Sequence, residues 1–227
     1  MSAIADNIKV IDQQIRAAAG RAGRDRSEIT LISVSKAIEP DLVEAALQAG
    51  QTIFGESKVQ EARAKIPIVS SRARWHLIGH LQSNKARDAV ALFDVIHSVD
   101  SLRLAEDVNK WSERSGKTQA ILLEVNVSGE ASKFGLKPED LESTLKAINP
   151  LSRLDVRGLM TVAPYTKDAA EARPYFRRLR ELRDALGLRD LSMGMSHDFE
   201  VAIEEGATMV RIGTAIFGER KRREPSE

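Results

Sequence analysis

Short apolar segments alternate with longer amphipathic segments along nearly the whole chain. Eight of the short segments have the length and the β-branched content of strands. They lie at residues 30–35, 52–54, 75–80, 95–99, 120–127, 154–162, 191–195 and 209–212. A helical pattern separates each strand from the next, and the first of these helices begins at Pro40, a residue favoured in a first turn. An opening helix is also predicted, with one apolar stripe formed by Ile8, Val10, Ile11 and Ile15.

This alternation predicts the fold class. Strands that alternate with helices pair in parallel through right-handed crossovers. Eight such units match a closed (β/α)8 barrel, which typically takes about 200–250 residues. The alternative is an open doubly wound sheet, which has roughly five or six strands and a Gly-x-Gly-x-x-Gly turn after the first strand. This chain has no such turn after its first predicted strand. We therefore predict an α/β protein whose residues 1–227 form one domain, a single TIM barrel.

Composition narrows the function classes. The 34 basic and 33 acidic side chains are interleaved and leave a net charge of +1, so no nucleic-acid partner is expected. The only basic run, Arg220, Lys221, Arg222 and Arg223, is expected to be a solvated tail. The absence of cysteine excludes disulfides and thiolate sites and suits a reducing cytosol. No signal peptide and no apolar run of about 18–20 residues is present, so we expect a soluble cytoplasmic protein without a membrane partner.

In a (β/α)8 barrel, the chemistry lies where the strands end and the following loops begin. Lys36 comes directly after the apolar first strand. Desolvation there is expected to lower the pKa of its ammonium group, which would make the amine able to form a Schiff base with an aldehyde. The alternative is a lysine whose aliphatic stem merely covers the rim while its charge stays in water.

A second candidate feature is the pair of loops after strands seven and eight, which often hold phosphate in these barrels. Ser196 and Thr214 offer hydroxyl donors there, and Gly213 permits close approach of the backbone. The alternative is that Ser196 or Asp198 is simply the N-cap of a helix over residues 199–205. An amine on strand one and a phosphate site at the last two loops together indicate a phosphate-bearing aldehyde. Pyridoxal 5′-phosphate (PLP) fits, and so does the phosphosugar of a Schiff-base aldolase.

Longer sequence blocks carry a more specific resemblance. They include Val34-Ser35-Lys36, Phe54-Gly55-Glu56, Val59-Gln60-Glu61, the run WHLIGHLQSNK at 75–85, Val125-Asn126-Val127, Lys133-Phe134-Gly135, Gly158-Leu159-Met160, LSMGMS at 191–196, Asp198-Phe199 and MVRIGTAIFG at 209–218. In these blocks the chain resembles the pyridoxal phosphate homeostasis proteins, once described as "proline synthetase co-transcribed" homologues. The blocks run in order from about residue 30 to residue 218.

The resemblance implies a fold-type III PLP barrel, similar to the barrel half of alanine racemase. Lys36 would carry PLP as a Schiff base, and Arg211 would face the pyridine nitrogen. The phosphate side would be formed by Met193, Gly194, Ser196, Gly213 and Thr214. One departure is visible at Ser57-Lys58, where the family usually has Asn followed by Tyr or Arg. The contact made by that asparagine is therefore not expected here.

The same resemblance favours storage and delivery of PLP over turnover. PLP is a strong electron sink when its ring nitrogen is protonated, and an arginine at position 211 acts only as a donor. The chain stops a few residues after its eighth strand, so the C-terminal β-domain of alanine racemase, with its second acid–base group and its dimer contacts, is expected to be absent. We thus predict a monomeric, non-enzymatic protein of vitamin B6 homeostasis, with PLP, amino acids and PLP-dependent apoenzymes as partners. An amino-acid racemase with Tyr165 as base, and a Schiff-base aldolase, are the alternatives.

The remaining chemically suggestive residues are predicted to be structural. His76 and His80 lie four apart but on one strand without a carboxylate cluster, so no metal site is expected. Trp75 and Trp111 are expected to pack rather than to stack on a ligand. Glu130 and Lys133 are expected to form a solvated pair in the loop after strand five.

Overall fold

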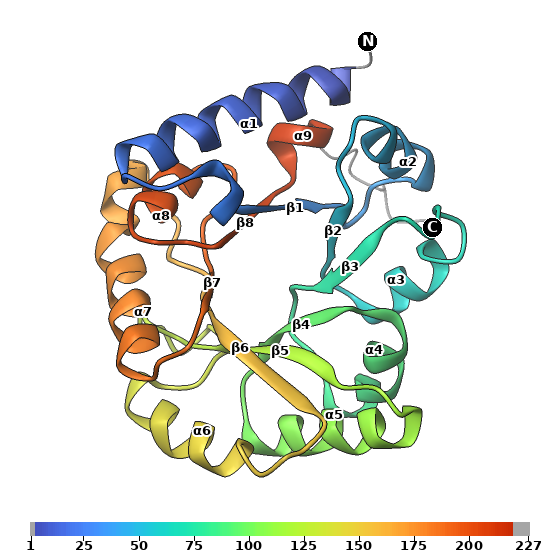
Figure 1. Ribbon diagram of the computed structural model, residues 1–227, viewed down its shortest axis with the longest axis vertical. Helices are drawn as coiled ribbons and strands as arrows, with labels where there is room; N and C mark the ends of the chain where they lie inside the picture. Colours follow the sequence, from blue (N-terminus) through green and yellow to red (C-terminus); the bar gives the residue numbers. More distant parts are fainter. Residues whose placement is uncertain (1–2, 220–227) are drawn as a thin grey trace.

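The computed structural model describes residues 3–219 and confirms the predicted barrel. Eight parallel strands form one closed ring in chain order, and β8 pairs with β1 through Leu31 and Val210 to complete it (Figure 1). The strands are β1 Thr30–Val34, β2 Ile53–Glu56, β3 Arg74–Leu77, β4 Val95–Val99, β5 Gln119–Glu124, β6 Leu154–Met160, β7 Asp190–Ser192 and β8 Met209–Ile212.

Helices surround this ring on its outer side (Figure 1). They are α1 Ala3–Arg21, α2 Pro40–Gln48, α3 Val59–Lys65, α4 Ala86–Leu92, α5 Leu102–Ser115, α6 Leu141–Ile148, α7 Arg173–Ala185, α8 Phe199–Glu204 and α9 Thr214–Phe217. Short 3₁₀ turns occur at Arg26–Glu28, Ser83–Lys85, Pro138–Asp140 and Ala169–Ala172. The opening helix α1 packs against α8 and α9, which brings the two ends of the described chain to one side of the barrel. Over residues 3–219, no helix combines the length and the apolar character needed to cross a bilayer.

Local sequence signals set the ends of several helices. The hydroxyl of Ser101 accepts a hydrogen bond from the backbone N–H of Leu104 and caps the start of α5. Gly116, in the left-handed region with φ 68°, ends the same helix. Pro40 occupies the first turn of α2, as expected from its fixed φ.

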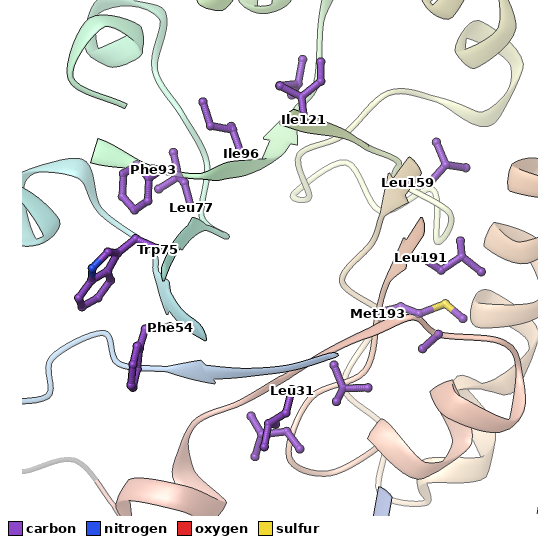
Figure 2. Close-up of a cluster of buried hydrophobic side chains, with 14 of the residues drawn as sticks. Leu31, Phe54, Trp75, Leu77, Phe93, Ile96, Ile121, Leu159, Leu191 and Met193 are labelled. Carbon is purple, nitrogen blue, oxygen red and sulfur yellow. The ribbon is translucent and has the colours of Figure 1, made fainter. Parts of the chain in front are cut away.

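The hydrophobic core has two layers. The larger layer lies between the strands and the helices, where Figure 2 shows Leu31, Phe54 and Trp75 extending outward from the ring. The rings of Phe54 and Trp75 are tilted against each other with centroids 5.5 Å apart, which confirms a packing role for this tryptophan. The smaller layer fills the barrel itself and is formed by Ile32, Leu122, Met160 and Met209.

The predicted bounds of the fourth and eighth strands are correct, and several others are too long at their C-terminal ends. The seventh strand was expected to reach Met195 but ends at Ser192, because Gly194 adopts φ 89° and turns the chain into the rim loop. The third strand was expected to reach His80 but ends at Leu77. The chain then passes very close to the β2 loop, since a Cβ added at Gly79 would lie 2.3 Å from the carbonyl oxygen of Ser57. The apolar stripe predicted for α1 also included one residue too many, because Val10 is 53% exposed.

Candidate functional site

The carboxyl ends of the strands open onto a cavity of about 330 Å3. Five of the predicted site residues line it together, namely Lys36, Ser196, Arg211, Gly213 and Thr214. They come from the ends of β1 and β8 and from the loop after β7. The volume lies within the range of about 300–1,000 Å3 that is typical of small-molecule sites. The rule that barrel chemistry lies at the C-terminal rim therefore predicted that these residues would lie together.

The backbone around Lys36 has an unusual conformation. Ala37, the next residue, has φ 58° and is the only non-glycine residue with positive φ in the described chain. This left-handed conformation costs a side-chain-bearing residue roughly 1–2 kcal/mol, so its surroundings must hold it in place. The carboxylate of Glu61 does so by accepting a hydrogen bond from the N–H of Ala37.

A buried ion network fixes the other side of the same turn. The ammonium of Lys65 donates to the carbonyl oxygen of Ser35 at 2.6 Å, to Glu56 Oε1 at 2.7 Å and to Glu61 Oε1 at 2.9 Å. The hydroxyl of Ser35 also donates to Glu56 Oε1, at 2.7 Å. Burial raises the pKa of Glu56, against the opposing effects of Lys65 and Ser35. The residues immediately before and after Lys36 are thus tied to α3, which determines where the lysine side chain starts.

Arg211 is held rigidly inside the barrel mouth. One of its terminal nitrogens donates to Ser192 Oγ at 2.6 Å, and the other donates to the carbonyl oxygen of Thr161 at 2.8 Å. Burial lowers the pKa of Arg211 to about 10, and Glu124 and Asp198 partly oppose this shift. The guanidinium therefore stays cationic at neutral pH and acts only as a hydrogen-bond donor toward the cavity.

Beneath Arg211, a chain of polar side chains crosses the barrel interior. Ser192 Oγ lies 2.9 Å from His97 Nδ1, and His97 Nε2 lies 2.9 Å from His76 Nδ1. Burial lowers the pKa of His76 to about 4 and lowers that of His97 well below its usual value. Both imidazole rings are therefore uncharged at neutral pH. His97 contacts the hydroxyl of Ser192, and His76 in turn contacts His97. His76 is an interior residue of β3 rather than half of a metal pair.

His80 lies in the loop after β3 and not on the strand. Its Nδ1 is 3.3 Å from Asp100, and its ring stacks on Phe134 with centroids 3.8 Å apart. Among residues 3–219, no group of three or more possible metal ligands is present.

The residues predicted to bind phosphate lie close to two helix starts, and only the start of α9 lines the cavity. α9 begins at Thr214 with Gly213 as its N-cap, and the first N–H groups of a helix have no acceptor within it. α8 begins at Phe199 with Asp198 as its N-cap, so Ser196 is not the cap residue. The carboxylate of Asp198 instead accepts a hydrogen bond from the N–H of Met195 at 2.7 Å, which shapes the loop that presents Ser196.

Met193 and Gly194 were expected to line the phosphate side, and the structure does not place them in the cavity wall. Met193 is fully buried in the outer core, where Figure 2 shows it beside Leu191. At Gly194 an added Cβ would lie 2.5 Å from the Cβ of Ala202, and its carbonyl oxygen accepts the N–H of Arg211 at 3.0 Å. Both residues therefore shape the loop and the strand next to the site.

The other residues singled out in the sequence lie in the cavity wall, at its rim or away from the cavity. Ser57 lines the cavity, whereas Lys58 is exposed beside it. Tyr165 is 83% exposed, and its ring lies 5.5 Å from that of His197 at the cavity rim. Trp111 packs on the core from α5 and carries Arg114 over its ring at 4.7 Å. The expected pair of Glu130 and Lys133 is present, with a separation of 3.0 Å.

Glu124 is a buried acidic residue that interacts electrostatically with Arg211 and was not predicted from the sequence. It ends β5, is only 8% exposed, and its Oε2 has no hydrogen-bond partner among the described residues. Burial, and to a smaller extent the charge of Asp100, raises the pKa of Glu124 to about 7, while Arg211 lowers it. An acidic residue within the strand predicted at residues 120–127 was visible in the sequence, but its burial was not.

The raised pKa of Glu124 predicts a measurable dependence of stability on pH. A carboxyl with a raised folded-state pKa binds more protons when folded, so its contribution to stability is lost as the pH rises toward about 7. We expect Glu124→Gln to remove this loss. In urea unfolding, the variant should gain on the order of 2–3 kcal/mol relative to the parent between about pH 5 and pH 8. A difference that stays constant with pH would contradict the assignment.

Known proteins resemble this chain along nearly its whole length. The family described as "Alanine racemase, N-terminal domain" matches residues 1–221. The chain belongs to this family. Curated relatives include the pyridoxal phosphate homeostasis proteins of Pseudomonas aeruginosa, 45% identical over 97% of both chains, and of Aquifex aeolicus, 44% identical over 92% of this chain and 95% of the other.

Solved structures of the family agree with the observed barrel. PipY of Synechococcus elongatus, in a structure with PLP bound, superposes with a TM-score of 0.83 at 37% identity and covers 95% of this chain and all of its own. An alanine racemase of Clostridium difficile shares the fold with a TM-score of 0.74 at 15% identity. This chain covers 58% of that racemase, so the likeness is to its barrel part.

Proposed function

We propose that the chain binds PLP as a Schiff base on Lys36 and serves PLP homeostasis by storing the cofactor and delivering it. The observation that carries this proposal is the single cavity in which Lys36, the hydroxyls of Ser196 and Thr214, and the buried cation of Arg211 meet. An aldehyde-reactive amine and an anion-binding side in one cavity suit a phosphorylated aldehyde. The names of the curated relatives and the PLP-bound PipY structure support the same ligand.

Each residue has a definable task toward the cofactor. Lys36 provides the amine, and its position is set by the clamped turn at Ala37. Ser196, Thr214 and the backbone at Gly213 would bind the phosphate, with Met193 and Gly194 supporting the loop from behind. Arg211 would donate to the pyridine nitrogen, held in place by Ser192 and Thr161.

The electrostatics of the cavity favour holding PLP over using it. Bound PLP supplies an electron sink, which is strongest when a carboxylate partner keeps the ring nitrogen protonated. In the described part of the chain, no residue lining this cavity is a carboxylate, and Arg211 cannot accept a proton. We infer that amino-acid turnover is weak or absent, so that residues 1–227 work as one PLP-binding domain and not as an enzyme.

Tyr165 supports a second candidate function, an amino-acid racemase. Its ring meets that of His197, which lines the cavity, so the pair could supply an acid–base group at the rim. Incubating the PLP-loaded protein with L-alanine in deuterated water separates the two functions. A carrier restores activity to a PLP-dependent apoenzyme and leaves the α-proton of alanine in place, whereas a racemase exchanges it. We further propose that the protein acts as a monomer in the cytoplasm, which gel filtration and fractionation would check.

The phosphate side predicts a selective loss of affinity. Replacing Ser196 with Ala, or Thr214 with Val, removes one hydroxyl donor while leaving Lys36 in place. Hydrogen bonds to charged groups contribute about 1.5–3 kcal/mol, so each variant should bind PLP about tenfold or more weakly in equilibrium titrations. Pyridoxal, which lacks the phosphate, serves as the control ligand and should bind the variants and the parent alike. Equal losses for both ligands would place the phosphate elsewhere.

A further inference from the structure

A second, smaller cavity adjoins the site just described. It has a volume of about 210 Å3 and lies between the end of β5, the loop that follows it and the residues after β6. Val162 lines both this cavity and the one that contains Lys36, so the two are immediate neighbours. None of the residues proposed to contact PLP lines the smaller cavity.

The smaller cavity has an acidic group that lacks a partner. Glu124 lines it and is 92% buried, and its Oε2 has no hydrogen-bond partner in the described chain. A buried polar group without a partner costs stability, and an ionised carboxylate costs more than a neutral group. Because the residue lines the cavity, a donor bound there would supply the hydrogen bond that the carboxyl group of Glu124 lacks.

A positive group lines the same cavity. Lys133 lines the cavity with its side chain 23% exposed, and its ammonium contacts Glu130 Oε1 at 3.0 Å and the carbonyl oxygen of Val162 at 3.3 Å. A lysine ammonium has three donors, so these two contacts leave capacity for another acceptor. Phe134 and Val162 supply apolar wall in the same cavity, and the ring of Phe134 is held by its stack on His80.

We propose that this cavity binds a small α-amino acid, with the ammonium group on Glu124 and the carboxylate on Lys133. A zwitterion matches a cavity that is lined by both an acidic and a basic side chain, and a short side chain suits its apolar wall. The choice of an amino acid rests on the proposed function, since amino acids are the amines that PLP chemistry acts on. The amino acid would sit next to the cavity that holds the cofactor.

Calorimetric titration of the full chain with glycine and L-alanine tests the proposal, first on PLP-free and then on PLP-loaded protein. N-acetyl-L-alanine lacks the ammonium and alaninamide lacks the carboxylate, so both should bind at least about tenfold more weakly, which corresponds to about 1.4 kcal/mol. Glu124→Gln should weaken alanine binding to PLP-free protein by a similar factor. Lys133→Gln, at the more exposed rim, should weaken it about threefold or more. Glu106→Gln, an exposed glutamate on α5, is the matched control and should change nothing.

The outcomes separate this proposal from the proposed function. If PLP-free protein binds alanine through Glu124 but never takes up PLP, the amino-acid cavity stands and the homeostasis function is wrong. If the protein takes up PLP but binds alanine no better than N-acetyl-L-alanine, the cavity assignment is overturned and the PLP function stands. Unchanged alanine affinity in a folded Glu124→Gln variant also overturns it.

Discussion

Replacing Lys36 with alanine is expected to abolish the visible absorbance that the protein acquires on incubation with PLP. Among the described residues that line the cavity, only Lys36 carries a primary amine, the group that forms a Schiff base with an aldehyde. Without it, PLP would be held only by its phosphate contacts and by Arg211. We expect the apparent affinity to fall by a factor of about 100 or more, the largest effect of any single substitution on cofactor binding.

The measurement is an absorbance titration of parent and variant with PLP, followed by borohydride treatment. Lys58→Ala is the matched control, because Lys58 is an exposed lysine beside the cavity that does not line it. It should retain the band and lose it on reduction, as the parent does. A Lys36→Ala variant that still develops a reducible band would show that another lysine holds the aldehyde.

Replacing Lys65 with methionine is expected to cause the largest loss of stability. The substitution leaves Glu56, which is fully buried, without its ion partner, and it also removes the donor to Ser35 and Glu61. Removing one member of a buried pair typically costs about 3–5 kcal/mol, because a buried charge is left uncompensated. Urea unfolding measures the loss. Because the clamp on the turn at Ala37 is released, PLP uptake by the remaining folded protein should also slow.

Two further variants make the test specific. Arg63→Met changes a basic residue on the same helix whose side chain is 75% exposed, and it should cost less than about 1 kcal/mol. Combining Lys65→Met with Glu56→Gln removes both charges and should recover part of the lost stability. If the single and double variants were equally unstable, the loss would come from packing and not from the unpaired carboxylate.

The sequence was sufficient to predict the barrel and the residues at its mouth. Strand and helix patterns repeat regularly, and the topology then forces every strand to end at one rim. Lys36, Ser196 and Thr214 could thus be grouped although they lie up to 178 residues apart along the chain. A general rule of the fold supplied the contact that spacing alone could not.

The supporting residues could not be found in this way. Lys65 reaches Ser35 across 30 positions, and His97 reaches Ser192 across 95. Such contacts form only when two side chains on different elements point inward at the same height along the barrel axis. No short sequence motif predicts that height. Met193 was wrongly predicted to line the cavity. It belongs to the most distinctive sequence block, yet its side chain packs in the outer core and does not line the cavity.

The claim on which the whole account depends is that Lys36 holds the aldehyde of PLP. The most direct test is to load the purified chain with PLP, reduce it with borohydride, digest it and locate the pyridoxyl group by mass spectrometry. The account predicts a single modified peptide, the one that contains Lys36. A label on Lys58, Lys65 or Lys133 instead, or no label at all, would contradict it.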